Sequence, residues 1–184
     1  MLAAWSAACE SRRVDDITAS ETIDIVDDED RVVDRATRRE MRERNLLHRA
    51  VYIFVVNSGG ELFVHRRTAT KDVYPGYWDV CIGGVVVAGE SYDAAAEREI
   101  AEELGVMGGP LRPLGKLRFE DAGTRIHGAV YAAAHDGPFV LQAEEILSGA
   151  FVPRAERERV LAEERCCPDG VAAWRAFGER LRDG

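Results

Sequence analysis

Three glutamates lie close enough along the chain to bind one cation together. Glu99, Glu102 and Glu103 have the spacing i, i+3 and i+4, so in an α-helix their carboxylates share one face within about one turn. Like charges at these spacings destabilise a helix by about 0.2–0.5 kcal/mol per pair. Carboxylate oxygens are the ligands that Mg²⁺ and Mn²⁺ prefer. The three residues therefore indicate a divalent-cation site, and the alternative is a solvated acidic helix face.

The stretch 84–106 contains the elements that would position these carboxylates. Small residues precede an alanine-rich run, and Gly105 is typical of a helix end because it adopts the left-handed conformation without a Cβ penalty. We therefore expect a strand, a loop and then a helix. An apolar stripe on another side of that helix would be buried, and it consists of Ala96, Ile100 and Leu104.

An ion pair between a glutamate and an arginine would hold the loop against the helix. Glu90 precedes the expected helix and Arg98 lies within it. If the loop folds back, Glu90 can accept a bidentate pair of hydrogen bonds from the Arg98 guanidinium. Such a pair would lock the loop and aim the neighbouring carboxylates, so we predict a structural role for both residues.

The full spacing of this stretch resembles the Nudix box at every defined position. Its defined residues are Gly84, Glu90 after five residues, Arg98-Glu99 after seven more, Glu102-Glu103 and Gly105. In the Nudix family this loop–helix–loop binds Mg²⁺ and hydrolyses a diphosphate linkage, usually in a nucleoside diphosphate joined to another group. The resemblance therefore implies a metal-dependent hydrolase in which water attacks a diphosphate phosphorus.

The same resemblance implies roles for individual residues. Glu102 and Glu103 would be metal ligands, and Glu99 would be a ligand or the base that activates water. Gly83, directly ahead of the box, would offer its carbonyl oxygen to a metal. Many Nudix enzymes place another acidic ligand or base late in the chain, so Glu145 is a candidate, with Glu120 behind it; for each, the alternative is a solvated carboxylate.

A basic and aromatic loop, residues 66–79, interrupts an otherwise acidic chain. Its cations suit phosphate oxygens that the metals do not reach, although its arginines could equally pair with surface carboxylates. The loop looks like that of the isopentenyl-diphosphate isomerase-like branch, in which an Arg and a Lys four residues later contact the diphosphate. These positions are Arg67 and Lys71 here. Tyr77 could stack on a base or ring, although such a residue more often packs.

The chemistry of the isomerases themselves is not expected. The position of their cysteine is Gly83, and two of their three metal-site histidines fall on Met41 and Val85, so that only His48 matches. The four histidines share no metal-ligand spacing, and we assign them no catalytic role. The sequence predicts a hydrolase, and the alternatives are an isopentenyl-diphosphate isomerase and a non-catalytic nucleotide-binding sensor.

Length and composition predict a single globular domain. The chain has 184 residues, of which 46% are hydrophobic and 31% are charged, which suffices for one sizeable core. A net charge of −9 argues against a nucleic-acid partner and makes bound cations necessary for a polyphosphate substrate. The four cysteines show no Cys-x-x-Cys spacing, and no run approaches the roughly 20 apolar residues of a membrane span. We expect a cytoplasmic protein that does not contact a membrane.

The expected fold class is α/β, an α/β/α sandwich with a mixed sheet, in which the box helix and the C-terminal helices cover opposite faces. Residues 1–20 are predicted to be a loosely ordered extension of a single domain over residues 21–184. Residues 22–34 are predicted to form an appended β-hairpin, followed by a short helix that Thr37 caps.

Further strands are expected over residues 48–56, 61–65, 111–119 and 124–133, with a short one at 139–141. The second of these should pair with the first across a turn at residues 58–60. A helix should begin at Pro153. Asp169 is expected to cap a last helix, whose apolar stripe would dock on the body or on a second subunit, so that a homodimer is one expectation.

Overall fold

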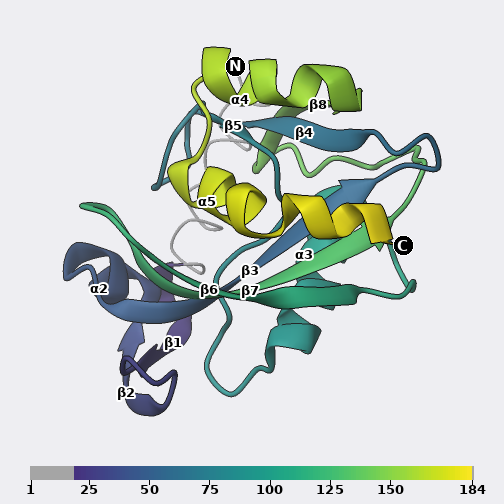
Figure 1. Cartoon of the computed structure of the whole chain (residues 1–184). Helices are drawn as coiled ribbons and strands as arrows, with labels where there is room; N and C mark the ends of the chain where they lie inside the picture. The colour runs from purple at the N-terminus through teal and green to yellow at the C-terminus, as the bar shows by residue number, and fades with distance from the viewer. Residues whose placement is uncertain (1–18, 184) are drawn as a thin grey trace, which may run out of the picture.

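The computed structural model shown in Figure 1 describes residues 19–183. The strands are β1 (Thr22–Val26), β2 (Val32–Thr37), β3 (Leu47–Val56), β4 (Leu62–Arg67), β5 (Trp78–Asp79), β6 (Arg112–Glu120), β7 (Arg125–Ala134) and β8 (Ile146–Val152). The helices are α2 (Arg38–Glu43), α3 (Tyr92–Leu104), α4 (Arg157–Glu163) and α5 (Pro168–Phe177), with 3₁₀ turns η1 (Arg154–Glu156) and η2 (Gly178–Asp183). The predicted extension over residues 1–20 lies almost wholly outside the described residues. Within the described part of the chain, no helix is long and apolar enough to cross a membrane.

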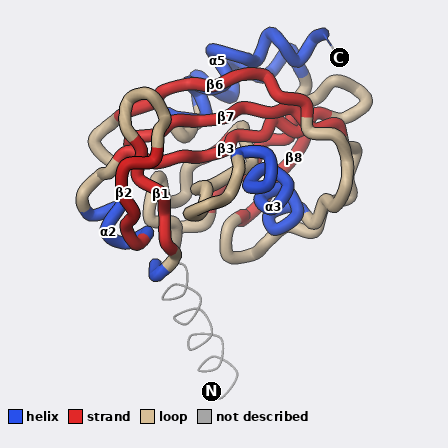
Figure 2. Tube along the Cα trace, turned by 90° about the horizontal axis from the view of Figure 1, so that it is seen from below, coloured by secondary structure: helices blue, strands red, loops and turns tan. Residues whose placement is uncertain are grey.

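Strand β3 is the centre of the sheet and separates two cores. It pairs in parallel with β7 along its whole length, from Leu47 opposite Arg125 to Val56 opposite Ala134. Because side chains alternate between the faces of a strand, Val51, Ile53 and Val55 pack with α3, and the residues between them pack with α5. Figure 2 shows α3 and α5 on opposite sides of β3, β6 and β7. The predicted α/β/α arrangement with a mixed sheet is confirmed.

Strands β3 and β4 separate directly after the turn that joins them. They share one register pair, Val56 opposite Leu62, and β4 then pairs with β8 from Leu62 to Arg67. The prediction that this segment pairs along the preceding strand is therefore wrong beyond the first pair, because a strand from much later in the chain takes its place. Along the edge of β3 from which β4 has separated, residues 82–86 form the backbone hydrogen bonds instead.

These residues bring the loop ahead of α3 against the middle of the sheet. The amide of Val51 donates to the Gly84 carbonyl at 2.9 Å, and Ile53 and Ile82 exchange hydrogen bonds of 2.7 and 2.9 Å. The expected strand before the helix is present only as isolated bridges at Ile82 and Val85. A regular ladder is interrupted there because Gly83 has a φ of 153°.

Two further local predictions need correction. Residues 139–141 form no strand, since the amide of Val140 donates to the Leu104 carbonyl at 3.0 Å and so closes the end of α3. The last helix begins at Pro168 with Cys167 as its N-cap, so Asp169 lies inside the first turn and does not cap it. Proline favours the first helical position because its fixed φ suits a helix and its missing N–H would have no partner there.

The N-terminal hairpin and short helix are confirmed, and they dock on the body. Thr37 and Glu40 form the predicted capping box, in which Thr37 Oγ1 accepts from the Glu40 amide at 3.2 Å. Met41 is 1% exposed and packs with Ile23, Ile25 and Val85. This contact fixes α2 beside the loop that precedes α3.

Candidate functional site

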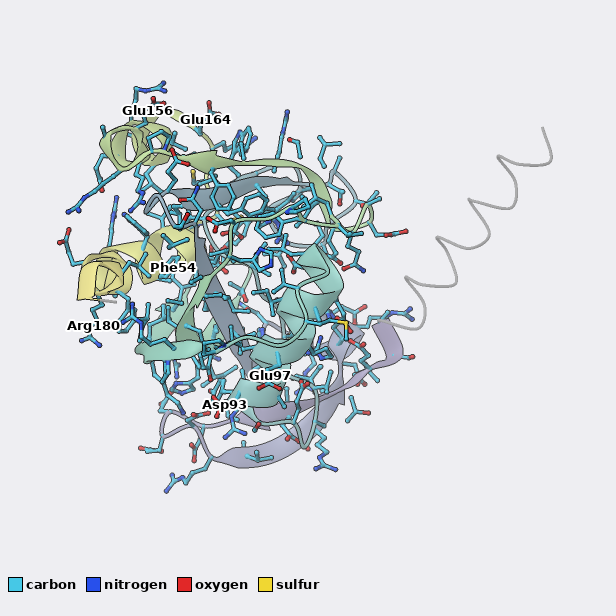
Figure 3. All side chains as sticks on the ribbon, turned by 90° about the vertical axis from the view of Figure 1, so that its right-hand side faces the viewer. Phe54, Asp93, Glu97, Glu156, Glu164 and Arg180 are labelled. Carbon is cyan, nitrogen blue, oxygen red and sulfur yellow. The ribbon has the colours of Figure 1, made fainter. Side chains whose placement is uncertain are left out.

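Helix α3 has the ends and the buried face that the sequence predicts. Ser91 Oγ accepts from the Ala94 amide at 3.1 Å, and Gly105 ends the helix in the left-handed conformation with a φ of 68°. The predicted apolar stripe is buried against the sheet and consists of Ala96, Ile100 and Leu104. The outward side of the helix includes the exposed residues Asp93 and Glu97 (Figure 3).

Arg98 links the loop to the helix through five hydrogen bonds. Its Nε and Nη2 donate to the two Glu90 carboxylate oxygens at 3.0 and 3.1 Å, which is the predicted bidentate pair. Nη2 also reaches the Val85 carbonyl at 3.2 Å, and Nη1 donates to Glu99 Oε1 at 2.7 Å and to Glu102 Oε2 at 3.1 Å. The guanidinium therefore holds the loop and orients two of the candidate metal ligands.

The three helical glutamates do not point in one direction. Glu99 and Glu103 are buried, with 9% and 6% exposure, whereas the Glu102 side chain is 52% exposed. A helix turns by about 100° per residue, so Glu102 and Glu103 diverge although each lies near Glu99. Among residues 19–183, no three His, Cys, Asp or Glu side chains are close enough to form a metal-ligand set in this arrangement.

The buried carboxylates nevertheless fit a divalent cation. Burial raises the pKa of Glu103 to about 8, and the negative charge of Glu99 acts in the same direction. Burial also raises the pKa of Glu99, against the opposing effect of Arg98. A bound divalent cation would favour the ionised form of both groups, and their hard oxygens suit Mg²⁺ or Mn²⁺. Glu99 and Glu103 would hold the ion, and a rotation of the exposed Glu102 side chain would complete the set.

Gly83, directly ahead of the box, and Gly84, its first residue, are required by close packing. A Cβ at Gly84 would lie 2.6 Å from Glu99 Oε1, and a Cβ at Gly83 would lie 2.0 Å from the Val51 carbonyl oxygen. The backbone of this loop therefore passes directly beside the Glu99 carboxylate. A cysteine, as the isomerases carry, would not fit at Gly83 without moving β3. The Gly83 carbonyl as a metal ligand stays a prediction.

A cavity that opens to solvent lies next to these glycines. The residues that line it include Arg38 and Arg42 on α2, His48 and Tyr52 on β3, Arg67 and Lys71 in the basic segment, Gly83 and Gly84, and Asp169 on α5. The cavity thus connects the backbone beside the box to the predicted phosphate-binding cations.

Arg67 and Lys71, the predicted substrate-binding residues, both line the cavity. Arg67 Nη2 donates to the Val73 carbonyl at 3.1 Å, and Nη1 lies 3.9 Å from Asp79 Oδ2. Lys71 forms an ion pair with Glu145. Burial and the neighbouring Arg67 lower the pKa of Lys71 to about 8. The structure thus brings Glu145 to Lys71; phosphate binding by Lys71 and metal binding by Glu145 stay predictions.

Two other candidates lie elsewhere. Tyr77 is not among the cavity-lining residues, because its ring packs under the Arg165 guanidinium at 4.5 Å and beside Tyr74. Glu120 pairs with Arg118 and Arg125 near the tip of the β6–β7 hairpin. Tyr77 therefore stabilises the loop by packing, and Glu120 belongs to a surface ion-pair group.

Sequence reasoning missed several cavity residues, above all Arg42. Its Nη1 donates to Thr124 Oγ1 at 3.3 Å, and its Nε lies 3.3 Å from Asp72 Oδ2. Arg38 and Arg42 have the spacing i, i+4, which places them on one face of a helix. That spacing was a usable signal, but the direction of the face depends on how Met41 docks α2 on the body.

Comparisons with known proteins find similar sequences and a similar structure. The model of the NUDIX domain family matches residues 46–175. An uncharacterized Nudix hydrolase of Pseudomonas aeruginosa is 45% identical over 161 residues, covering 86% of this chain and 94% of its own. One of Streptomyces coelicolor is 47% identical over 160 residues, covering 85% and 88%. The crystal structure of DR0079 from Deinococcus radiodurans superposes with a TM-score of 0.72 at 30% identity, covering 84% and 98%.

Proposed function

Because the chain belongs to the NUDIX domain family, and is thus a hydrolase of pyrophosphate bonds, we propose that it acts with Mg²⁺ or Mn²⁺ on a small phosphorylated metabolite. The favoured substrates are derivatives of a nucleoside diphosphate. The observation that carries the proposal is the continuity of the site. The Arg98-held glutamates of α3 adjoin, through Gly84, a cavity that Arg67 and Lys71 line.

The chain's own residues would divide the work as follows. Glu99, Glu102 and Glu103 would hold the metal, which when bound neutralises charge on phosphoryl oxygens and lowers the pKa of water. Arg67 and Lys71 would hold diphosphate oxygens on the cavity side. Arg98 would not touch the substrate, because its five hydrogen bonds are made to Glu90, to the loop and to the helical glutamates.

A panel of substrates tests the proposal. Nucleotide sugars, dinucleotides, nucleoside triphosphates and prenyl diphosphates would be incubated with Mg²⁺ or Mn²⁺ and, separately, with EDTA. We expect two phosphorylated products from at least one nucleoside diphosphate derivative with metal and none with EDTA. Binding without cleavage across the panel would instead indicate a nucleotide sensor, and a rearranged prenyl skeleton would indicate an isomerase.

Lys71→Ala should raise the KM for the best substrate about 10-fold, equivalent to ~1.4 kcal/mol of binding. The change in kcat should be smaller, because a contact made in both the ground state and the transition state contributes uniform binding. Steady-state kinetics on the purified variant measure both. Lys116→Ala is the matched control, since Lys116 is an exposed lysine paired with Asp30 outside the cavity. If the KM of Lys71→Ala equals that of Lys116→Ala, Lys71 does not bind the substrate.

A further inference from the structure

The cavity contains buried polar atoms that have no hydrogen-bond partner. Among the described residues, His48 Nε2, Asp169 Oδ1, Arg42 Nε and Arg67 Nε are unpartnered, and all four residues line the cavity. Buried polar groups in native proteins are normally paired, and leaving one unpaired costs free energy. The four residues that carry these atoms thus give the cavity wall hydrogen-bonding capacity that the protein itself leaves unused, and a ligand could use it.

The chemistry of His48 narrows the kind of ligand. Its Nδ1 lies 2.9 Å from the Leu46 carbonyl oxygen, which can only accept, so Nδ1 carries the proton. Burial, with the nearby Arg42, lowers the pKa of His48 to about 3, and the ring is neutral. Nε2 therefore presents a lone pair, and the residue is 1% exposed. This atom can accept a hydrogen bond but cannot donate one.

The other unpartnered atoms add both donors and a carboxyl oxygen. Asp169 Oδ2 accepts from the Tyr52 hydroxyl at 3.1 Å, which leaves Oδ1 unpaired. Arg42 Nε lies within ion-pair distance of Asp72 but is not aligned for a hydrogen bond. Arg67 Nε has no partner among the described residues. A matching ligand group must therefore both donate and accept.

Three classes of ligand group can be compared on these atoms. An apolar chain would leave every one of them unpaired. A phosphate or carboxylate would satisfy the arginines but would set its negative oxygens against the lone pair of His48. A metal ion is disfavoured, since only His48 Nε2 and Asp169 Oδ1 among these atoms could bind one, and the Arg42 and Arg67 guanidiniums would repel a cation. A hydroxylated group satisfies donors and acceptors together.

We propose that His48 Nε2 accepts a hydrogen bond from a hydroxyl of the substrate's second half, so that the cavity selects a hydroxylated group such as a sugar and rejects a prenyl chain. The inference rests on the proposed function, because it names the part of the substrate beyond the diphosphate. A site built to hydrogen-bond a hydroxyl discriminates strongly against an analogue that lacks it, since the site's own polar groups are then left unpaired. His48 is thus a specificity-determining residue.

The test compares kcat/KM for ADP-ribose, UDP-glucose and geranyl diphosphate in the wild type and in His48→Leu. The wild type should prefer a hydroxylated substrate. His48→Leu should lower kcat/KM for that substrate by about 100-fold and leave geranyl diphosphate within about 3-fold. His48→Gln offers an amide oxygen as acceptor and should recover most of the loss.

Matched variants separate this role from a structural one. His65→Leu removes another buried histidine that also has an unpartnered ring nitrogen but does not line the cavity, so the substrate preference should not change. His48→Met removes the nitrogen at similar volume and replaces His48→Leu if thermal melting shows that the latter does not fold.

The outcomes distinguish this inference from the function on which it rests. An unchanged preference in the folded apolar variants, or a wild type that prefers geranyl diphosphate, would overturn the assignment of His48 while hydrolysis itself stands. Failure of the wild type to cleave any diphosphate with Mg²⁺ would overturn the proposed function and this inference together.

Discussion

Glu103→Gln is expected to reduce the rate of diphosphate cleavage by about 10³-fold, equivalent to ~4 kcal/mol of transition-state stabilisation. Glu103 is buried and interacts electrostatically with Glu99, so the amide would remove one of the two buried carboxyl groups that would bind a divalent cation. The fold should survive, because an amide of nearly the same shape relieves repulsion between two buried carboxylates. Mg²⁺ titration of the initial rate, together with thermal melting, measures both effects.

The control for this variant lies on the same helix. Glu97 is exposed on α3 (Figure 3), and Glu97→Gln removes the same formal charge without touching the buried pair. Glu102→Gln should resemble Glu103→Gln in activity if its side chain rotates to join the site. Full activity of Glu103→Gln at saturating Mg²⁺ would show that Glu103 is not a metal ligand.

Arg98→Ala should lower both activity and stability. The substitution removes five hydrogen bonds and leaves Glu90, Glu99 and Glu102 without their shared cation. The Arg98 side chain is 30% exposed, so solvent screens part of this loss, and we expect about 1–3 kcal/mol of lost unfolding free energy. Urea denaturation measures it.

The comparison with Glu99→Gln gives this prediction its sharpest test. Glu99→Gln should reduce activity as strongly as Arg98→Ala but cost less stability, because Arg98 keeps its bonds to Glu90 and to the Val85 carbonyl. Arg175→Ala, an exposed arginine on α5, controls for loss of a helical arginine in general. Equal losses of unfolding free energy in Arg98→Ala and Glu99→Gln would contradict this division of roles.

The parts of the site that the sequence predicts well are those that local spacing determines. Helix α3 ends at Gly105 because the residue's left-handed conformation is a local property, and Glu90 meets Arg98 because both belong to one short loop–helix unit. Local spacing does not determine the direction of the Glu102 side chain. Its spacing places it near Glu99, yet only the packing of α3 on the sheet decides that Glu103 turns inward and Glu102 outward.

The parts that the sequence did not reveal depend on contacts between distant segments. His48 and Asp169 are 121 residues apart, and they line one cavity because β3 is central and α5 covers its face. The separation of β3 from β4 has a similar cause, since β8, far along the chain, pairs with β4. No local pattern around Leu62 signals that competition.

The most direct test of the account is cleavage of a nucleoside diphosphate derivative in ¹⁸O-labelled water with Mg²⁺, followed by ³¹P NMR. The account predicts that one phosphorylated product carries the isotope shift of a single ¹⁸O bonded to phosphorus, that no product forms in EDTA, and that Glu103→Gln forms product at about a thousandth of the wild-type rate. Products without ¹⁸O on phosphorus, or equal rates with and without metal, would contradict metal-assisted attack of water on the diphosphate.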